Sequence, residues 1–259
     1  MDGLDKFREH FIDFKENYVI IGGLASYLLL EDSGFDMVRA TKDIDIVLCA
    51  EALDKKFVNH FWDFVRAGGY NAIKQSTGGR RFYRFTEPTE SGYPKMLEIL
   101  SNKSGMVETA EVGSIAPMTV EEEIVSLSAI LLNEEYYNFI MKQKIELEGV
   151  VIADEKCIIP LKARAWIDNK ERKAKGENVQ SGDIKKHKND IYKLSQLLTN
   201  KPLEGVPEVI KIDITRFVDE TTDDDVFLKT IGISDLSMEQ IKGVLMKVYC
   251  NDSILTPKI

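Results

Sequence analysis

The sequence has few of the features that mark disulfide-rich, zinc-binding or membrane-spanning proteins. Its 259 residues contain three cysteines, Cys49, Cys157 and Cys250, which form neither an even disulfide set nor a metal-ligand spacing. No apolar run approaches the roughly 20 residues that a transmembrane helix needs. The opening segment, MDGLDKFREH, is polar and mixed in charge, which is unlike a signal peptide. We therefore expect a cytoplasmic protein with reduced thiols and no membrane partner.

The charge of the chain is negative overall but unevenly distributed. A formal net charge of −9 argues against a protein that coats nucleic acid over its whole surface. Between Lys156 and Lys193, however, 11 Lys and Arg stand against 5 Asp and Glu, a local charge of +6. This segment could bind a partner that carries phosphates, or it could be a pair of helices whose charges simply face solvent.

Periodicity predicts a small α/β domain with a mixed sheet over residues 1–115. An amphipathic helix is expected at the start, because apolar residues recur there at helical spacing from Leu4 to Phe14. A short apolar run and two glycines follow it, and strands and helices then alternate. The strands are expected at 18–21, 42–48, 70–75, 81–85 and 95–100, and the further helices at 24–32 and 52–67.

The remainder of the chain, residues 116–259, is predicted to be a mainly helical domain. Residues 119–147 are expected to be mostly helical, although the segment SLSAILL fits a strand equally well. The stretch GVVIADEKCIIP predicts a strand and turn that lead into a helix with Pro160 in its first turn. Ser181 is a suitable N-cap for the next helix, and the acidic tail beyond 203 is expected to be helical as well.

Two aspartates, Asp43 and Asp45, stand two positions apart within the apolar strand KDIDIVL. Alternate side chains of a strand share a face, so both carboxylates are expected on one face while Ile44 and Ile46 point into the core. Carboxylates so close repel each other unless a cation lies between them, and oxygen ligands favour Mg²⁺. The pair alone is a weak signal, because such pairs on exposed strands are commonly ordinary polar surface.

Two other features of the sequence favour the metal-site interpretation. Gly22 and Gly23 join the strand YVII to a helix, and a glycine turn at a helix N-terminus allows a phosphate to approach the backbone. Glu98 interrupts the apolar strand KMLEIL on the face where it could join Asp43 and Asp45. Three convergent carboxylates can hold two Mg²⁺ ions, which activate an attacking hydroxyl and stabilise the leaving pyrophosphate.

Together, the segments IGGLAS, RATKDIDIVL and LEIL resemble the signature of the polymerase-β-like nucleotidyltransferase superfamily. In that signature a glycine turn precedes an apolar-Asp-x-Asp strand, and a third acidic residue lies on a later strand. More narrowly, GGLA with R-x-T-x-D-I-D-I is similar to the AbiEii-type nucleotidyltransferases, the toxins of type IV toxin–antitoxin and abortive-infection systems. The superfamily likeness covers residues 15–102, and a looser one, at PLKARAW and DIKKHKNDIYKL, covers 158–198. The chain departs from the pattern at Leu24 and Ala25, where many relatives have a serine.

The resemblance implies a small nucleotidyltransferase domain, completed by the helical one, with a role for each matching residue. Asp43 and Asp45 would hold both Mg²⁺ ions, and Glu98 would be the third ligand and the base for the acceptor hydroxyl. Ser26 would supply the hydroxyl that the glycine turn lacks. The nucleotide-binding set implied in this way is Gly22, Gly23, Ser26, Arg39, Thr41, Lys162, Lys188 and Asp190.

The implied activity is Mg²⁺-dependent transfer of a nucleotidyl group from an NTP to a hydroxyl. The resemblance points to RNA, to tRNA ends in particular, or to a protein as the acceptor, and to a cognate antitoxin as a possible partner. The alternative is a non-catalytic module on the same fold that binds a nucleotide or a partner. Three carboxylates favour the enzyme, because a binding module has no need to keep them unneutralised.

Other polar residues have a structural explanation beside the functional one. Lys162 is expected in the first turn of a helix, where the dipole disfavours a cation, so a phosphate partner explains it better than an ordinary surface position. His187 shares a helical stripe with Ile191 and is expected to be a packing residue rather than a catalytic one. Three arginines near STGGR could contact nucleotide or acceptor, or could form an exposed charged strand face: Arg80, Arg81 and Arg84.

Overall fold

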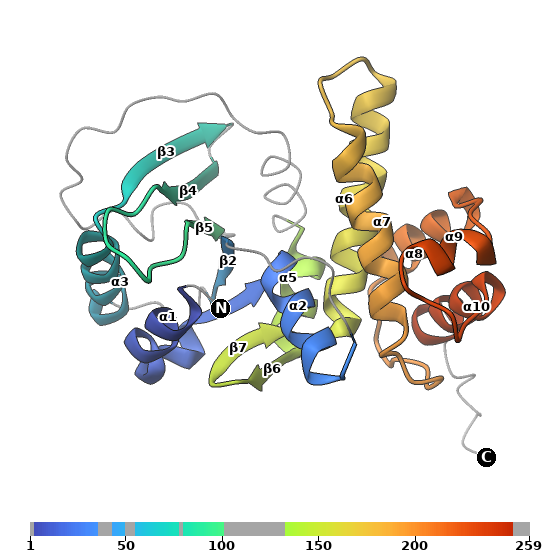
Figure 1. The fold of residues 1–259 in the computed structure, drawn as a ribbon, viewed down its shortest axis with the longest axis horizontal. Coiled ribbons are helices and arrows are strands. Elements are labelled where there is room, and N and C mark those ends of the chain that lie inside the picture. The colour runs from blue at the N-terminus through green and yellow to red at the C-terminus, as the bar shows by residue number, and fades with distance from the viewer. Residues whose placement is uncertain (1–2, 36–42, 50–54, 78–79, 101–132, 251–259) are drawn as a thin grey trace. The chain divides into compact units, whose positions relative to one another are not determined.

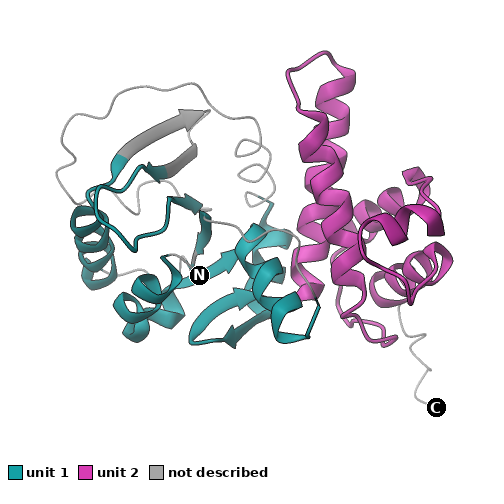
Figure 2. Ribbon diagram, viewed as in Figure 1, with its two compact units in different colours: residues 1–154 teal, residues 155–259 magenta. Residues whose placement is uncertain are grey.

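The computed structural model describes residues 3–35, 43–49, 55–77, 80–100 and 133–250. They belong to two compact units, residues 1–154 and 155–259 (Figure 1, Figure 2). The first unit combines helices with a mixed sheet, which confirms the predicted α/β class. The second contains helices throughout its described part.

A seven-stranded sheet with the order β3-β4-β5-β2-β1-β7-β6 forms the centre of the first unit. Two neighbouring pairs, β1–β7 and β2–β5, are parallel, and the other pairs are antiparallel. The strands are β1 (Tyr18–Ile21), β2 (Asp43–Leu48), β3 (Asn71–Thr77), β4 (Arg80–Thr86), β5 (Met96–Leu100), β6 (Lys144–Leu147) and β7 (Val150–Ala153).

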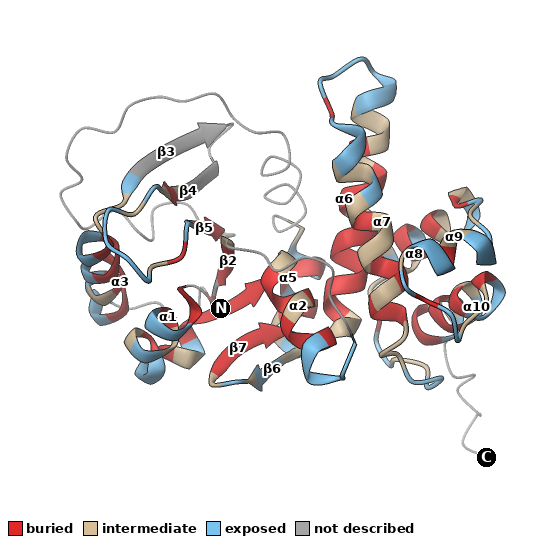
Figure 3. Cartoon of the chain, in the orientation of Figure 1, coloured by how far each residue is buried: buried red, intermediate tan, exposed pale blue. Residues whose placement is uncertain are grey.

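The helices of the first unit surround this sheet, and β1 is buried along its whole length (Figure 3). These helices are α1 (Leu4–His10), the 3-10 helix η1 (Ile12–Asn17), α2 (Gly22–Asp32), α3 (Lys55–Gly68) and α5 (Glu134–Lys142). An aromatic cluster joins α1, β1 and α3, since Phe7 makes edge contacts with Tyr18 and Phe64 at centroid distances of 5.3 and 5.9 Å. Burial of such large side chains supplies much of the stability of a small unit.

The division between the units differs from the predicted boundary after residue 115. That boundary lies in 101–132, outside the described residues, and the structure divides the chain after Asp154. The reason is that β7 pairs with β1 through Ile20 and Ile152, and β6 pairs with β7, so both strands belong to the first sheet. The expectation of mainly helical structure over 119–147 is therefore wrong at β6, while α5 agrees with it.

The second unit is built around the antiparallel hairpin of α6 and α7, with α8 and α10 packed against it (Figure 1). Its helices are α6 (Glu155–Ala174), α7 (Ser181–Ser195), α8 (Glu208–Glu220), α9 (Asp225–Thr230) and α10 (Met238–Tyr249). Ile158, Ile191 and Ile214 are among the residues that are fully buried in this packing. The apolar stripes that predicted these helices are thus the faces that they bury.

Pro160 lies inside α6 rather than in its first turn, because the helix already begins at Glu155. Proline has no N–H, so the carbonyl of Lys156, four residues earlier, loses its helical hydrogen bond. The hydroxyl of Tyr249 on α10 donates to that carbonyl instead, at 3.0 Å. The broken backbone bond is thus replaced by a contact that ties α10 to α6.

A reciprocal pair of histidines joins α1 to α3 in the first unit. Nε2 of His10 donates to the carbonyl of His60 at 2.9 Å, and Nε2 of His60 donates to the carbonyl of His10 at 2.6 Å. Their rings stack with centroids 3.9 Å apart. A carbonyl only accepts, so both rings carry a proton on Nε2. Burial lowers the pKa of His10, the charge of His60 lowers it further, and Asp63 and the carbonyl bond oppose this.

This pair should make the first unit less stable in acid. The pKa of His10 is lower in the folded protein than its ordinary 6.5, so the stabilisation is complete above pH 6.5 and is lost as the pH falls through the folded pKa. Urea unfolding of the wild type and of His10→Gln at about pH 7.5 and pH 5 measures the effect. The wild type should lose more stability on acidification than the variant, and parallel losses would contradict the account.

Candidate active site

A row of charged side chains crosses three neighbouring strands of the first sheet. Glu98 on β5 faces Asp45 on the parallel strand β2, and on its other side it faces Arg84 on the antiparallel strand β4. Directly paired residues project to the same face of a sheet and lie close together. The register of the sheet thus brings two carboxyl groups and a guanidinium together in the order Arg84, Glu98, Asp45.

Gly22 closes the row at the other end. Asp45 pairs with Ile21 at the end of β1, and Gly22 then begins α2 with a φ of +70°, a conformation that favours glycine. A Cβ atom at Gly22 would lie 2.1 Å from Oδ2 of Asp45, so only glycine leaves room for this carboxylate. The N-terminus of an 11-residue helix therefore begins beside Asp45, where its dipole stabilises negative charge.

Glu98 is the most strongly perturbed acid of the row. The residue is 6% exposed, and its pKa is raised to about 8, first by burial and then by the negative charge of Asp45. A hydrogen bond with Asp45 also raises this pKa, while Arg84 lowers it. Arg84 donates to Oε1 of Glu98 from Nε at 2.8 Å, and its Nη2 lies 2.7 Å from the same oxygen. One proton and one guanidinium thus balance the two carboxylates.

Asp43 lies on the same face of β2, two residues before Asp45, and pairs with Met96 rather than with an acid. Within the described part of the chain, no three His, Cys, Asp or Glu side chains are arranged so that they could hold a metal ion. The donor chemistry still suits a hard cation, because the available groups are carboxylate oxygens that repel each other. Asp45 and Glu98 would hold such an ion, with Asp43 beside them, once Glu98 exchanges its present hydrogen bonds for the metal.

Lys162 and Asp190 form a buried ion pair within the second unit. Lys162 lies in the second turn of α6 rather than in the first, and it is 5% exposed. Its Nζ donates to Oδ2 of Asp190 on α7 at 2.6 Å. The interpretation of Lys162 as an ordinary surface lysine is therefore wrong. The contribution of this pair to phosphate binding remains a prediction.

Lys188, the other predicted cation of α7, belongs to a second polar cluster. Its Nζ donates to Asp223 at 2.7 Å and lies 4.5 Å from the centroid of the Phe227 ring. The hydroxyl of Tyr192 donates to the same carboxylate at 2.9 Å, and burial raises the pKa of this tyrosine. No pattern in the sequence predicted a role for Asp223, because its segment TTDDD resembles an exposed loop or cap.

The remaining predicted residues are placed as follows. Ser26 is buried, and its hydroxyl donates to the carbonyl of Gly22 at 2.7 Å, one helical turn earlier, so in this structure it faces the backbone of α2. Gly23 is partly exposed as the second residue of that helix. His187 is buried on α7, in agreement with a packing role. The predictions for Arg39 and Thr41 and for the side chains of Arg80 and Arg81 lie outside the described residues.

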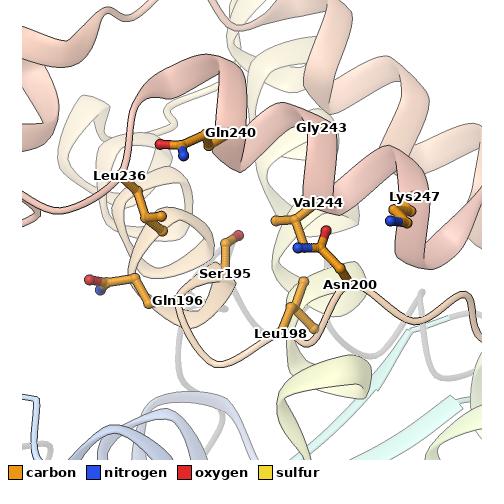
Figure 4. Close-up of a pocket in the computed structure, with 9 residues that line it drawn as sticks. All are labelled: Ser195, Gln196, Leu198, Asn200, Leu236, Gln240, Gly243, Val244 and Lys247. Carbon is orange, nitrogen blue, oxygen red and sulfur yellow. The ribbon is translucent and has the colours of Figure 1, made fainter.

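A groove of about 430 Å³ lies within the second unit, between the end of α7 and α10 (Figure 4). Leu198, Leu236 and Val244 form its apolar part, and Gln196, Asn200, Gln240 and Lys247 are among its polar residues. It contains none of the residues singled out from the sequence. The charged row of the first sheet is therefore the better candidate for the active site.

Comparisons with known proteins give one distant structural likeness. No family model matches the chain, and no curated protein matches its sequence. The chain is similar to the crystal structure of an antigenic nucleotidyltransferase-like protein from Paracoccidioides brasiliensis. The two share 16% sequence identity over 87% of this chain and 88% of that chain, with a TM-score of 0.45. Separately, none of the described helices is long and apolar enough to span a bilayer.

The raised pKa of Glu98 predicts how the metal-free protein responds to pH. The folded protein holds a proton that the unfolded chain releases above about pH 4.5, so this contribution to stability is complete below 4.5 and is lost as the pH rises through about 8. Glu98→Gln cannot titrate. Between about pH 5 and pH 8.5 in EDTA, the free energy of unfolding of the wild type should therefore fall relative to this variant. The relative fall should exceed about 1.4 kcal/mol, which corresponds to one pKa unit. If the unfolding free energies of the wild type and the variant depend equally on pH, Glu98 does not hold a proton beside Asp45 as described.

Proposed function

We propose that this chain is a metal-dependent nucleotidyltransferase that moves a nucleotidyl group from an NTP to a hydroxyl acceptor. One observation carries the proposal: Asp45 and Glu98 lie side by side on neighbouring parallel strands, next to the glycine that begins α2. Carboxylates beside a helix N-terminus combine ligands for a cation with a place for phosphate. Two Mg²⁺ ions held by Asp43, Asp45 and Glu98 would supply charge neutralisation at the phosphates and activation of the acceptor hydroxyl.

The residues of the chain would contribute mainly by positioning and by charge. The first turn of α2, with Gly22 and Gly23, would bind the triphosphate through backbone N–H groups. Glu98 would accept the proton of the attacking hydroxyl, as the sequence resemblance implies. Lys162 and Lys188 are proposed as further phosphate ligands of the second unit, because phosphoryl transfer depends on cations placed around the phosphates.

The acceptor is proposed to be RNA, tRNA in particular, or a protein hydroxyl. The excess of Lys and Arg between Lys156 and Lys193 supports a phosphate-bearing acceptor, since a local sequence charge of +6 stands out in a chain of net charge −9. Two of these cations, Lys170 and Lys188, pair with acids outside the segment and would exchange those partners for phosphate. A role as the toxin of a type IV toxin–antitoxin system, neutralised by a cognate antitoxin, is part of the same proposal and rests on the sequence resemblance alone.

A non-catalytic module that binds a nucleotide or a partner is the second candidate. The contact between Arg84 and Glu98 favours it, because the guanidinium already neutralises one carboxylate without a metal. Such a module would bind an NTP without releasing pyrophosphate. The two candidates therefore differ in turnover rather than in binding.

Replacing Asp43 and Asp45 by Asn should abolish nucleotidyl transfer while the protein stays folded. The purified protein is incubated with each labelled NTP, Mg²⁺ and either total RNA or total protein, and label incorporation and pyrophosphate release are measured. Loss of metal and phosphate neutralisation should reduce the rate by at least about 10³-fold. Asp32→Asn, at the exposed end of α2, is the matched control and should retain full activity. Transfer by the double variant at the wild-type rate would refute the proposed enzyme activity at this site. NTP binding without turnover in the wild type would favour the non-catalytic binding module.

A further inference from the structure

Arg84 supplies positive charge to the carboxylate row without a metal. Its guanidinium contacts Oε1 of Glu98 through both Nε and Nη2. The backbone register fixes this contact, because Arg84 and Glu98 are direct partners between β4 and β5. Glu98 is in turn the direct partner of Asp45. The cation is therefore part of the sheet, held at one end of a row of two acids.

The environment of the pair makes this charge important. The side chains of Arg84 and Glu98 are 15% and 8% exposed, so water screens their attraction far less than it screens an exposed ion pair. An acid at this position without a counter-ion would carry a large desolvation penalty. Removal of Arg84 should therefore leave uncompensated negative charge at Asp45 and Glu98, which another cation can neutralise.

A divalent cation at the same carboxylates would compete with Arg84. The two Arg84 contacts use the acceptor capacity of Oε1, so a metal must take the other oxygen or displace the guanidinium. A metal ion close to a guanidinium is also repelled by it. The contact and the metal thus oppose each other through both geometry and charge.

We infer that Arg84 is a built-in counter-ion of the site, so that a divalent cation at Asp45 and Glu98 binds in competition with the contact between Arg84 and Glu98. This inference rests on the proposed function, since it takes the two acids as the metal ligands. Its consequence is a metal-free protein that is stable but binds free cation weakly. A guanidinium released from Glu98 is a good phosphate ligand, so a nucleotide that arrives with its cation would offset the lost contact.

The test compares Mn²⁺ binding, by calorimetry and by thermal unfolding, in the wild type and in Arg84 variants. Arg84→Gln should be less stable than the wild type without metal, and its unfolding temperature should rise more when Mn²⁺ is added. Its Kd for Mn²⁺ should be lower by about tenfold or more, because no charge-assisted contact has to be broken. Arg84→Lys keeps the positive charge but cannot donate from two nitrogens as the guanidinium does, and it should give an intermediate Kd.

Two further variants separate this effect from a general loss of stability. Arg164→Gln removes a guanidinium that lies 3.3 Å from the buried carboxylate of Asp213 in the second unit. It should lower stability without any gain in Mn²⁺ binding. The double variant Arg84→Gln with Glu98→Gln removes both charges, and it should be more stable without metal than Arg84→Gln alone and lose the enhanced response to Mn²⁺.

Mn²⁺ binding by the Arg84 variants that is equal to or weaker than wild-type binding would overturn the inference. If Arg84→Gln does not fold, Arg84→Lys alone decides the question by the same criterion. Failure of the proposed function has a different signature, in which the wild type and all variants bind no Mn²⁺, with or without NTP, and transfer no label. If the wild type binds Mn²⁺ and transfers label while the Arg84 variants bind no tighter, only the inference fails.

Discussion

The contact between the carboxyl groups of Glu98 and Asp45 is the constraint on which the site depends. Two acids that face each other across β5 and β2 cannot both be ionised inside a protein without a compensating charge. The structure compensates from both ends, with Arg84 on β4 and the N-terminus of α2 beside Gly22. The raised pKa of Glu98 shows that this compensation is incomplete, and the same imbalance makes the row attractive to a cation.

The architecture of the first unit serves to hold this row in register. β1 is buried throughout, and it carries the chain to the exact point where α2 begins beside Asp45. Two sets of contacts join α1 to α3 beside the sheet. They are the aromatic cluster of these helices and the paired imidazoles of His10 and His60. Packing at a distance from the acids therefore determines where they lie, as expected when a site is built on strands rather than on loops.

Local patterns in the sequence were sufficient to predict the α/β class, the strands around Asp45 and Glu98, and a shared face for the two acids. Apolar alternation and the glycine turn carry this information, because both are properties of neighbouring residues. Strand order is not local, so the pairing of Arg84 with Glu98 could not be predicted, nor could the addition of β7 to the sheet. The start of α6 was misplaced because Pro160 is tolerated inside the helix, where Tyr249 satisfies the freed carbonyl.

Asp45 and Glu98 are proposed above all as the ligands of a divalent cation beside the start of α2. The most direct measurement is an anomalous difference map from crystals grown with Mn²⁺ and a non-hydrolysable NTP analogue. We expect a peak within coordination distance of both carboxylates, with the guanidinium of Arg84 moved away from Oε1. A map without a peak at this position, with the Arg84 contact intact and nucleotide bound elsewhere, would contradict it.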